Sequence, residues 1–461
     1  MEKKGYILKK GTVLSLDDQI GNLKQADVVI TGSTIEAIGT NLQVDESAYH
    51  VIDATGQIIM PGLVDTHRHM WESLVRTAGT NWSLPVYLQN LYYGGLGSRL
   101  RPQDSYIANL LGSLEALYSG VTTVLDWSMP YSPEHTDELI RGLQESGIRS
   151  VFALGVSGET AYWNRESRLM IEDAERVKKQ YFSSRDQLLT MGLAIRGPEF
   201  SHWETTVAEI GIARQLDAIC SMHIGFGNWG AADRSVTKLY EAGLLGSDLN
   251  MVHGNKMQTE EYKMLADAGA SLSVTPEVEM MMGHGYPATG FFLEQGGMPS
   301  LGVDVVTSTG GDLFAQMKFM LQAERARVNE EILNSGNMPG ELNLLSAQVL
   351  QFATLGGARA LKLEDRIGQL TPGKQADIIM ISTSNLNTDL NLFPVIDPIG
   401  AVVQCTNPSN VDTVFVGGRL MKQHGQLVGV DLERIRRLVL ESREYLETQH
   451  VLSDADRVIY S

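Results

Sequence analysis

The chain has 461 residues, and its 43% hydrophobic and 20% charged content is typical of a globular protein with a large core, not of a disordered one. A formal net charge of −18 disfavours nucleic acids and anionic membranes as partners, because both are polyanions. The sequence shows no signal peptide and no apolar stretch of about 18 residues that could cross a bilayer, so we expect a cytoplasmic protein.

Short strands are predicted at both ends of the chain. Apolar or alternating runs separated by Gly, Asp and Asn are typical of strands and turns. They occupy residues 6–8, 13–14, 27–30 and 34–38, and later residues 376–382, 399–404, 413–416 and 419–421. Because these runs flank a larger central region, we expect residues 1–60 and 371–461 to form one small β-sandwich domain.

Eight short apolar runs alternate with longer stretches in the central region. The runs are residues 58–66, 122–127, 150–155, 189–196, 219–224, 250–253, 271–275 and 300–304. Intervening stretches such as 104–118 and 172–180 show helical spacing. This α/β alternation predicts a closed (β/α)8 TIM barrel over residues 61–370, with an open doubly wound sheet as the alternative. Further helices are expected at 345–361 and 432–447.

Four of the ten histidines fall at the predicted ends of the first, fifth and sixth barrel strands. His67 and His69 lie two residues apart, so both should face the mouth of the barrel. His223 and His253 end the fifth and sixth strands, and Asp304 ends the eighth. Barrel enzymes build their active sites at these strand ends. A His-x-His pair alone is weak evidence, but the whole set predicts a site for Zn²⁺ or Fe²⁺.

Three motifs carry a resemblance to a known family. They are IMPGLVDTHRH at 59–69, LGVD at 301–304 and GxLxPGKxAD at 368–377. Together with the strand-end histidines, they resemble the amidohydrolase superfamily over nearly the whole chain. The sequence is most similar to the branch that hydrolyses nucleobases, triazines and related cyclic amidines.

The resemblance implies a set of metal ligands, which are His67, His69, His223 and Asp304. It also implies that His253 is not a full ligand and orients the attacking water or the substrate.

The number of metal ions follows from the fourth strand. Members of the family with two metals carry a carboxylated lysine at the end of that strand. Here Arg196 lies near that end and no lysine does, so the resemblance implies one divalent ion per chain.

The sequence departs from the pattern at the fifth strand. Deaminases of this branch place a glutamate three residues after the fifth-strand histidine, where this chain has Phe226. Glu277 or Glu279, just past the seventh strand, could replace it, although an extended segment would point both the same way. We favour Glu279 as the catalytic group because it lies nearer the turn at 283–285.

Tryptophans recur at the predicted barrel mouth, where aromatic rings suit a flat heterocyclic substrate. One lies at or after the end of each of the first five strands, and another lies in the first loop: Trp71, Trp127, Trp163, Trp203, Trp229 and Trp82. A single tryptophan at such a position is more often a packing residue. The predicted substrate-binding residues are Trp71, Trp127, Arg196, Glu277 and His284, the last in a Gly-flanked loop.

The predicted function is metal-dependent hydrolysis of a C–N or C–heteroatom bond in a flat cyclic amidine or heterocycle. Asp304 would accept a proton from the attacking water and deliver it to the leaving group. His253 would stabilise the charge that develops at the ring carbon. The alternatives are ring opening similar to that of imidazolonepropionase or hydantoin-cleaving enzymes, release of a thiol or halide, and a non-catalytic scaffold. We expect a small-molecule substrate and a homo-oligomer.

Overall fold

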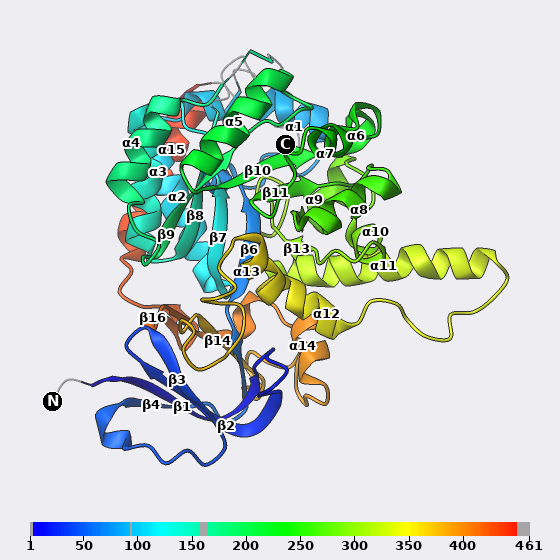
Figure 1. Ribbon diagram of the computed structural model, residues 1–461. Coiled ribbons are helices and arrows are strands. Elements are labelled where there is room, and N and C mark those ends of the chain that lie inside the picture. The colour runs from blue at the N-terminus through cyan, green and yellow to red at the C-terminus, as the bar shows by residue number, and fades with distance from the viewer. Residues whose placement is uncertain (1–2, 93–94, 157–164, 167, 450–461) are drawn as a thin grey trace, which may run out of the picture.

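Eight parallel strands form the centre of the protein in the computed structural model, which describes residues 3–92, 95–156, 165–166 and 168–449 (Figure 1). They pair in chain order and are β6 (Leu63–Arg68), β7 (Val121–Trp127), β8 (Arg149–Gly155), β9 (Leu189–Ala194), β10 (Ile219–Ile224), β11 (Leu249–His253), β12 (Ser271–Val274) and β13 (Ser300–Leu301). The last strand returns to the first through a parallel bridge between Arg68 and Asp304. The predicted TIM barrel is confirmed.

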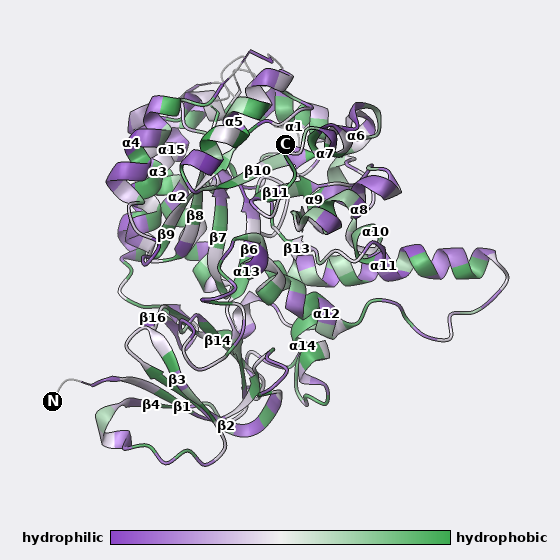
Figure 2. Cartoon of the chain, in the orientation of Figure 1, coloured by the Kyte–Doolittle hydropathy of each residue, from purple (hydrophilic) through white to green (hydrophobic). Residues whose placement is uncertain are grey.

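The strands of the barrel are buried along almost their whole length. Every residue of β7 and β8 is buried, as parallel strands covered on both faces require. In Figure 2 these two strands are mainly in the hydrophobic colour. This packing explains why their sequences are rich in apolar residues, with polar residues such as Thr122, Thr123 and Asp126 in between.

The predicted first strand, residues 58–66, is divided between two sheets at Gly62. The part before it is β5 (Gln57–Pro61), which pairs with the terminal sheet, and the part after it is β6. A Cβ atom at Gly62 would lie 2.1 Å from Oγ1 of Thr122 in β7. Glycine is therefore needed here because the backbone passes too close to β7 for any side chain.

Both ends of the chain build one mixed nine-stranded sheet, which lies below the barrel in Figure 1. The first half supplies β1 (Gly5–Leu14), β2 (Asn22–Thr31), β3 (Thr34–Gly39), β4 (His50–Asp53) and β5. The second half supplies β14 (Ile378–Ser382), β15 (Val411–Val416), β16 (Arg419–Gln423) and β17 (Gln426–Leu427). The halves join where β5 and β14 pair antiparallel. A small β domain from the two termini is thus confirmed.

One predicted strand of this domain is wrong. Residues 399–404 belong to the helix α14 (Pro398–Gln404). Pro398 occupies the first turn, and the side chain of Asp397 accepts a hydrogen bond from the Ile399 N–H. This start signal outweighs the β-branched residues that favoured a strand.

Helices surround the barrel, with their longer members on the outside. They include α2 (Pro102–Tyr118), α3 (Pro133–Ser146), α4 (Ile171–Tyr181), α5 (Trp203–Gln215), α8 (Thr259–Ala268), α11 (Leu313–Asn334) and α15 (Leu432–Thr448). The predicted helix 345–361 is α12 (Ser346–Gln351), a π-helical turn and α13 (Gly357–Ala360). Among the described residues, no helix combines the length and apolar character needed to span a membrane.

Short elements cover the carboxyl end of the barrel. The connection between β6 and α2 contains the 3-10 helix Met70–Val75 and α1 (Leu84–Leu91). The segments after β10 and β12 contain α6 (Gly227–Asp233), α7 (Ser235–Glu241) and α9 (Pro276–Met282). In Figure 1 α1, α6 and α9 lie at the end of the barrel that is farther from the terminal sheet.

Candidate metal centre

Four buried side chains converge at the carboxyl end of the barrel: His67, His69, His223 and Asp304. The Nε2 atoms of His67 and His69 each lie 3.3 Å from Oδ1 of Asp304. The Nε2 atom of His223 lies 3.2 Å from Nε2 of His67. One potential ligand atom from each of the four lies within 4.8 Å of all the others. The fold therefore brings together the residues that the sequence placed at three separate strand ends.

Backbone hydrogen bonds hold Asp304 beside His67 in β6 and His69 just after it. The Asp304 N–H donates to the carbonyl of His67, and the His69 N–H donates to the carbonyl of Asp304, both at 2.9 Å. Asp304 and His253 have φ angles of 68° and 79°, in the left-handed region. Such a conformation costs a non-glycine residue about 1–3 kcal/mol and is concentrated at functional sites.

Burial sets the protonation states of the group. It lowers the pKa of His67 to about 4 and holds the pKa of His223 well below its usual value. Burial alone would raise the pKa of Asp304, but hydrogen bonds from His67 and His69 hold it well below the usual range. His67 and His223 are thus neutral and Asp304 is ionised at neutral pH. These are the forms that bind a divalent metal, and this donor set suits Zn²⁺ or Fe²⁺.

His253 lies next to the four residues and connects them to a buried carboxyl group. Its Nε2 atom is 3.8 Å from Oδ2 of Asp304. Its Nδ1 atom is 3.1 Å from Oγ1 of Thr275 and 3.3 Å from Oε1 of Glu279. The same Glu279 oxygen accepts the Thr275 N–H at 2.8 Å. Burial raises the pKa of Glu279 to about 7, so this carboxyl can gain or lose a proton near neutral pH.

The two glutamates after the seventh strand point in different directions, contrary to the expectation for an extended segment. They lie in α9, which begins with Pro276, and residues two apart on a helix are separated by about 200°. Glu277 accepts a hydrogen bond from the side-chain amide of Gln316 at 2.8 Å. Glu279 instead lies fully buried against His253.

A narrow cavity lies against the metal-ligand group. Its volume is about 30 Å³, room for about two water molecules. The group itself contributes His69, His223 and Asp304 to the wall. His253 also lines the cavity, and so do residues of α1, α9 and the neighbouring loops. These residues are Leu84, Tyr87, Leu88, Tyr92, Phe226, Val278, Met282, His284 and Val305.

Glu72 is a buried carboxyl group that sequence analysis missed. It accepts hydrogen bonds from the hydroxyls of Tyr87 at 2.5 Å and Tyr92 at 3.4 Å, and both tyrosines line the cavity. Burial raises the pKa of Glu72 well above its usual value. The available signal is a glutamate inside the mostly apolar segment 70–75, directly after His69.

The predicted substrate-binding residues are divided between the cavity and its surroundings. The ring of His284 lines the cavity, 4.6 Å from the ring of His253. The Trp127 ring packs against the group of four converging residues, 4.5 Å from the ring of His223. Trp71 is buried one layer farther away, edge-on to Tyr92 at 5.7 Å. Neither Arg196 nor Glu277 is among the lining residues.

The other tryptophans are not gathered around this cavity. Trp203 begins α5, Trp82 is buried in the first loop, and Trp229 lines a separate cavity. Trp163 lies outside the described residues.

A sequence model of the Amidohydrolase family matches residues 58–421, which is most of the chain. A similar protein is the 5'-deoxyadenosine deaminase of Methanothermobacter thermautotrophicus, 27% identical over 88% of this chain and 91% of its own. Another is the 5-methylthioadenosine/S-adenosylhomocysteine deaminase of Pelotomaculum thermopropionicum, 25% identical over 93% and 96% of the two chains.

Solved structures show the same fold. A zinc-bound adenosine deaminase from Xanthomonas campestris superposes with a TM-score of 0.83 at 22% identity, covering 97% of this chain and 99% of that one. An atrazine chlorohydrolase from Arthrobacter aurescens superposes with a TM-score of 0.81 at 22% identity, covering 95% of this chain and all of that one. The whole described architecture, barrel and terminal sheet, is therefore shared.

Proposed function

The chain belongs to the amidohydrolase family, and we propose that it is a metal-dependent hydrolase of a C–N or C–heteroatom bond in a flat heterocycle. The observation that carries the proposal is the convergence of His67, His69, His223 and Asp304, whose ligand atoms lie within 4.8 Å of one another. The names of the relatives support the substrate class, since they are deaminases of adenosine derivatives.

We propose that these four residues hold one divalent ion, Zn²⁺ or Fe²⁺. No second group of metal-binding residues occurs in the part of the chain that the structure describes. The position after β9 that would favour a second ion is occupied by Arg196. Such an ion, when bound, lowers the pKa of water and so supplies a nucleophile near neutral pH.

The surrounding residues have separate proposed roles. Asp304 accepts the proton of the attacking water on its carboxylate and passes it to the leaving group. The Nε2 atom of His253 lies 3.8 Å from Asp304. From there His253 stabilises the charge that develops at the ring carbon as water attacks it. Glu279 is the second proton donor, and its contact with Nδ1 of His253 gives it a route to the site through that imidazole.

Substrate entry requires a movement of the cavity wall. A volume of about 30 Å³ is far below the roughly 300 Å³ of small-molecule pockets. The α1 segment and Phe226 are parts of the wall that lie outside the barrel strands. We propose that one of them shifts when a heterocycle binds, while Tyr87 and Tyr92 present hydroxyls to its polar edge.

Release of a halide or thiol is the second candidate reaction. It is favoured by Phe226, because a phenyl ring cannot protonate a ring nitrogen or an amine leaving group as a glutamate would. The predicted homo-oligomeric state and cytoplasmic location belong to the same proposal.

Product analysis tests the proposed reaction. Metal-loaded protein is incubated with 5'-deoxyadenosine, 5-methylthioadenosine, atrazine and a pool of other heterocycles, followed by mass spectrometry and ammonia detection. Hydrolysis at a ring carbon replaces the leaving group with oxygen, whereas ring opening gives a carboxylate and no free ammonia. Asp304→Asn serves as the control for contaminating enzymes. Metal uptake without turnover of any compound would instead favour the scaffold alternative.

A further inference from the structure

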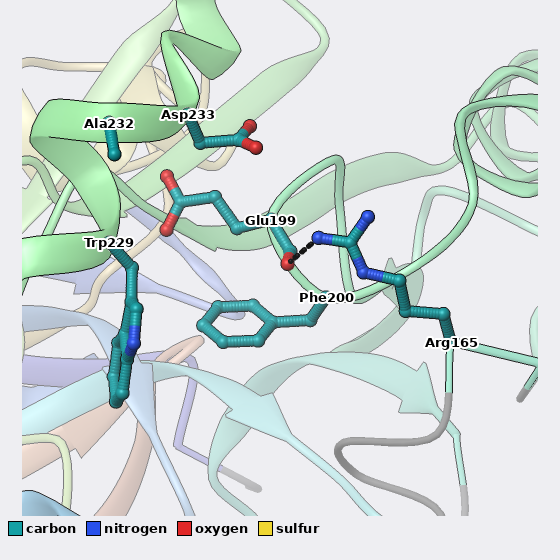
Figure 3. Close-up of a pocket in the computed structure, with 6 residues that line it drawn as sticks. All are labelled: Arg165, Glu199, Phe200, Trp229, Ala232 and Asp233. Carbon is teal, nitrogen blue, oxygen red and sulfur yellow. Dashed lines mark hydrogen bonds between the residues drawn. The ribbon is translucent and has the colours of Figure 1, made fainter.

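A second cavity lies at the same end of the barrel, beside the metal-ligand group. Its volume is about 320 Å³, in the size range of small-molecule pockets, and its lining residues are Arg165, Glu199, Phe200, Trp229, Ala232 and Asp233 (Figure 3). Glu199 and Phe200 follow β9, and the last three belong to α6. None of these residues has a role in the proposed hydrolysis.

Glu199 is the unusual group of this cavity. It is only 7% exposed, and one carboxylate oxygen accepts the Gly225 N–H at 2.6 Å. The other oxygen, Oε2, is buried and accepts no hydrogen bond of good geometry among the described residues. The Ser235 hydroxyl lies near enough to lower the pKa of Glu199 slightly, but it donates to Asp233. Burial, with a further contribution from the charge of Asp233, raises the pKa of Glu199 to about 8. A buried acceptor without a donor is costly, so a donor that enters the cavity is stabilised there.

The other two charged residues of this cavity have partners, whereas the Glu199 carboxyl group forms no ion pair among the described residues. Asp233 already pairs with Lys238 at 3.0 Å. Arg165 donates to the backbone carbonyl of Glu199 at 3.1 Å, and Figure 3 shows its guanidinium at the opposite end of the Phe200 ring from the Glu199 carboxylate. The Arg165 side chain therefore does not reach the carboxylate oxygens of Glu199.

Two aromatic rings stand beside these carboxylates. The centroids of Phe200 and Trp229 are 6.0 Å apart with the planes at 80°, so the rings form two sides of a corner. The Trp229 side chain is 36% exposed. Aromatic faces and a carboxylate both attract a cation and repel an anion. We propose that this cavity binds the ammonium or amidinium group of a small organic cation, between Glu199 and the Trp229 ring.

Phe226 connects this cavity to the metal-ligand group. Its ring stacks on Phe200 at 5.7 Å and lies 5.8 Å from Trp229, while its other contacts are His253 at 5.1 Å and His284 at 5.2 Å. The Phe226 ring lines the first cavity and packs against two aromatic residues, Phe200 and Trp229, that line the second. The cation can be a distal group of the substrate or a separate ligand. In both cases the positive group would pair with the Glu199 carboxylate.

Calorimetric titration of the metal-loaded full chain tests the site directly. The probes are n-butylammonium and n-butylguanidinium, with butyramide and butanoate as neutral and anionic controls. We expect saturable binding of the two cations only. The titration is run at pH 9, above the pKa of about 8, so that Glu199 is ionised. Glu199→Gln should then weaken this binding about tenfold or more, because it removes the charge, whereas its amide oxygen can still accept the Gly225 N–H. Trp229→Leu should weaken it about threefold or more by removing the aromatic face.

A control variant and three defined outcomes show whether the cations bind at Glu199. Glu260→Gln, at an exposed position of α8, should leave cation binding unchanged. The proposal is overturned if neither cation binds to the wild-type chain, if Glu199→Gln binds them equally well, or if butanoate binds better. The titration needs no turnover, so failure of the proposed hydrolysis leaves it intact. Where turnover is measured, inhibition by n-butylammonium indicates that the cavity binds a cationic group of the substrate. If n-butylammonium does not inhibit turnover, the cavity binds a separate ligand.

Discussion

Replacing Glu279 by glutamine removes one buried ionisable group without changing the shape of the side chain. Glu279 bonds both the Thr275 N–H at 2.8 Å and Nδ1 of His253 at 3.3 Å. The amide can keep the first contact, but it cannot supply a proton. Loss of a positioned acid costs about 10²–10⁴-fold in rate, so kcat should fall by that order while KM changes little.

The same substitution should stabilise the fold at high pH. Burial raises the pKa of Glu279 from 4.5 to about 7. Between these values the unfolded chain loses the proton and the folded chain keeps it, so stability falls as the pH rises. The full difference is about 3 kcal/mol as an upper bound, at about 1.4 kcal/mol for each pH unit. Glutamine carries no such penalty, so its advantage should be present at pH 8 and absent near pH 4.

Steady-state kinetics and thermal unfolding between pH 4 and 9 provide the assay. The wild type should lose activity as the pH rises through about 7, where Glu279 loses its proton, and this limb should be missing from the variant. Glu277→Gln is the matched control, because Glu277 faces Gln316. A kcat within twofold of wild type in Glu279→Gln, with the basic limb retained, would refute the assigned role.

Three further substitutions test other parts of the account. Asp304→Asn should remove nearly all turnover in a chain with an unchanged circular dichroism spectrum, and near-normal activity would contradict its role as proton acceptor. Tyr87→Phe removes the 2.5 Å hydrogen bond to buried Glu72 and should cost about 1–3 kcal/mol of stability, seen as a lower Tm. Gly62→Ala places a methyl group 2.1 Å from Thr122 Oγ1 and should also cost about 1–3 kcal/mol. The control is Gly211→Ala in α5, where an added Cβ atom would have no neighbouring atom within 4 Å. Equal Tm values for the two variants would contradict the steric argument.

The barrel and the ligand set could be predicted because their signals are local. The barrel strands are almost entirely buried and so are rich in apolar residues, and each proposed ligand lies at or just after the end of such a strand. His67 and His69 need only the two-residue period of a strand to face the same way. The remaining proposed ligands, His223 and Asp304, then follow from the rule that parallel strands end at one edge.

The features that were missed depend on competition between signals or on tertiary contacts. At 399–404 a proline and an aspartate cap outweigh β-branched residues, and at 276–279 the proline starts a helix where an extended loop was expected. The position of Glu279 behind His253 follows from that helix. Glu72 and its two tyrosines come together only because α1 folds back over the barrel, and a single sequence carries no sign of that contact.

Metal content tests the central claim most directly. The chain is stripped with a chelator, reloaded with Zn²⁺ or Fe²⁺, freed of excess ion and examined by elemental analysis and activity. We predict about one ion per chain, no turnover in the stripped protein, recovery on reloading, and loss of the ion in His67→Ala and His223→Ala. Two tightly bound ions per chain, or full activity in the stripped protein, would contradict the account.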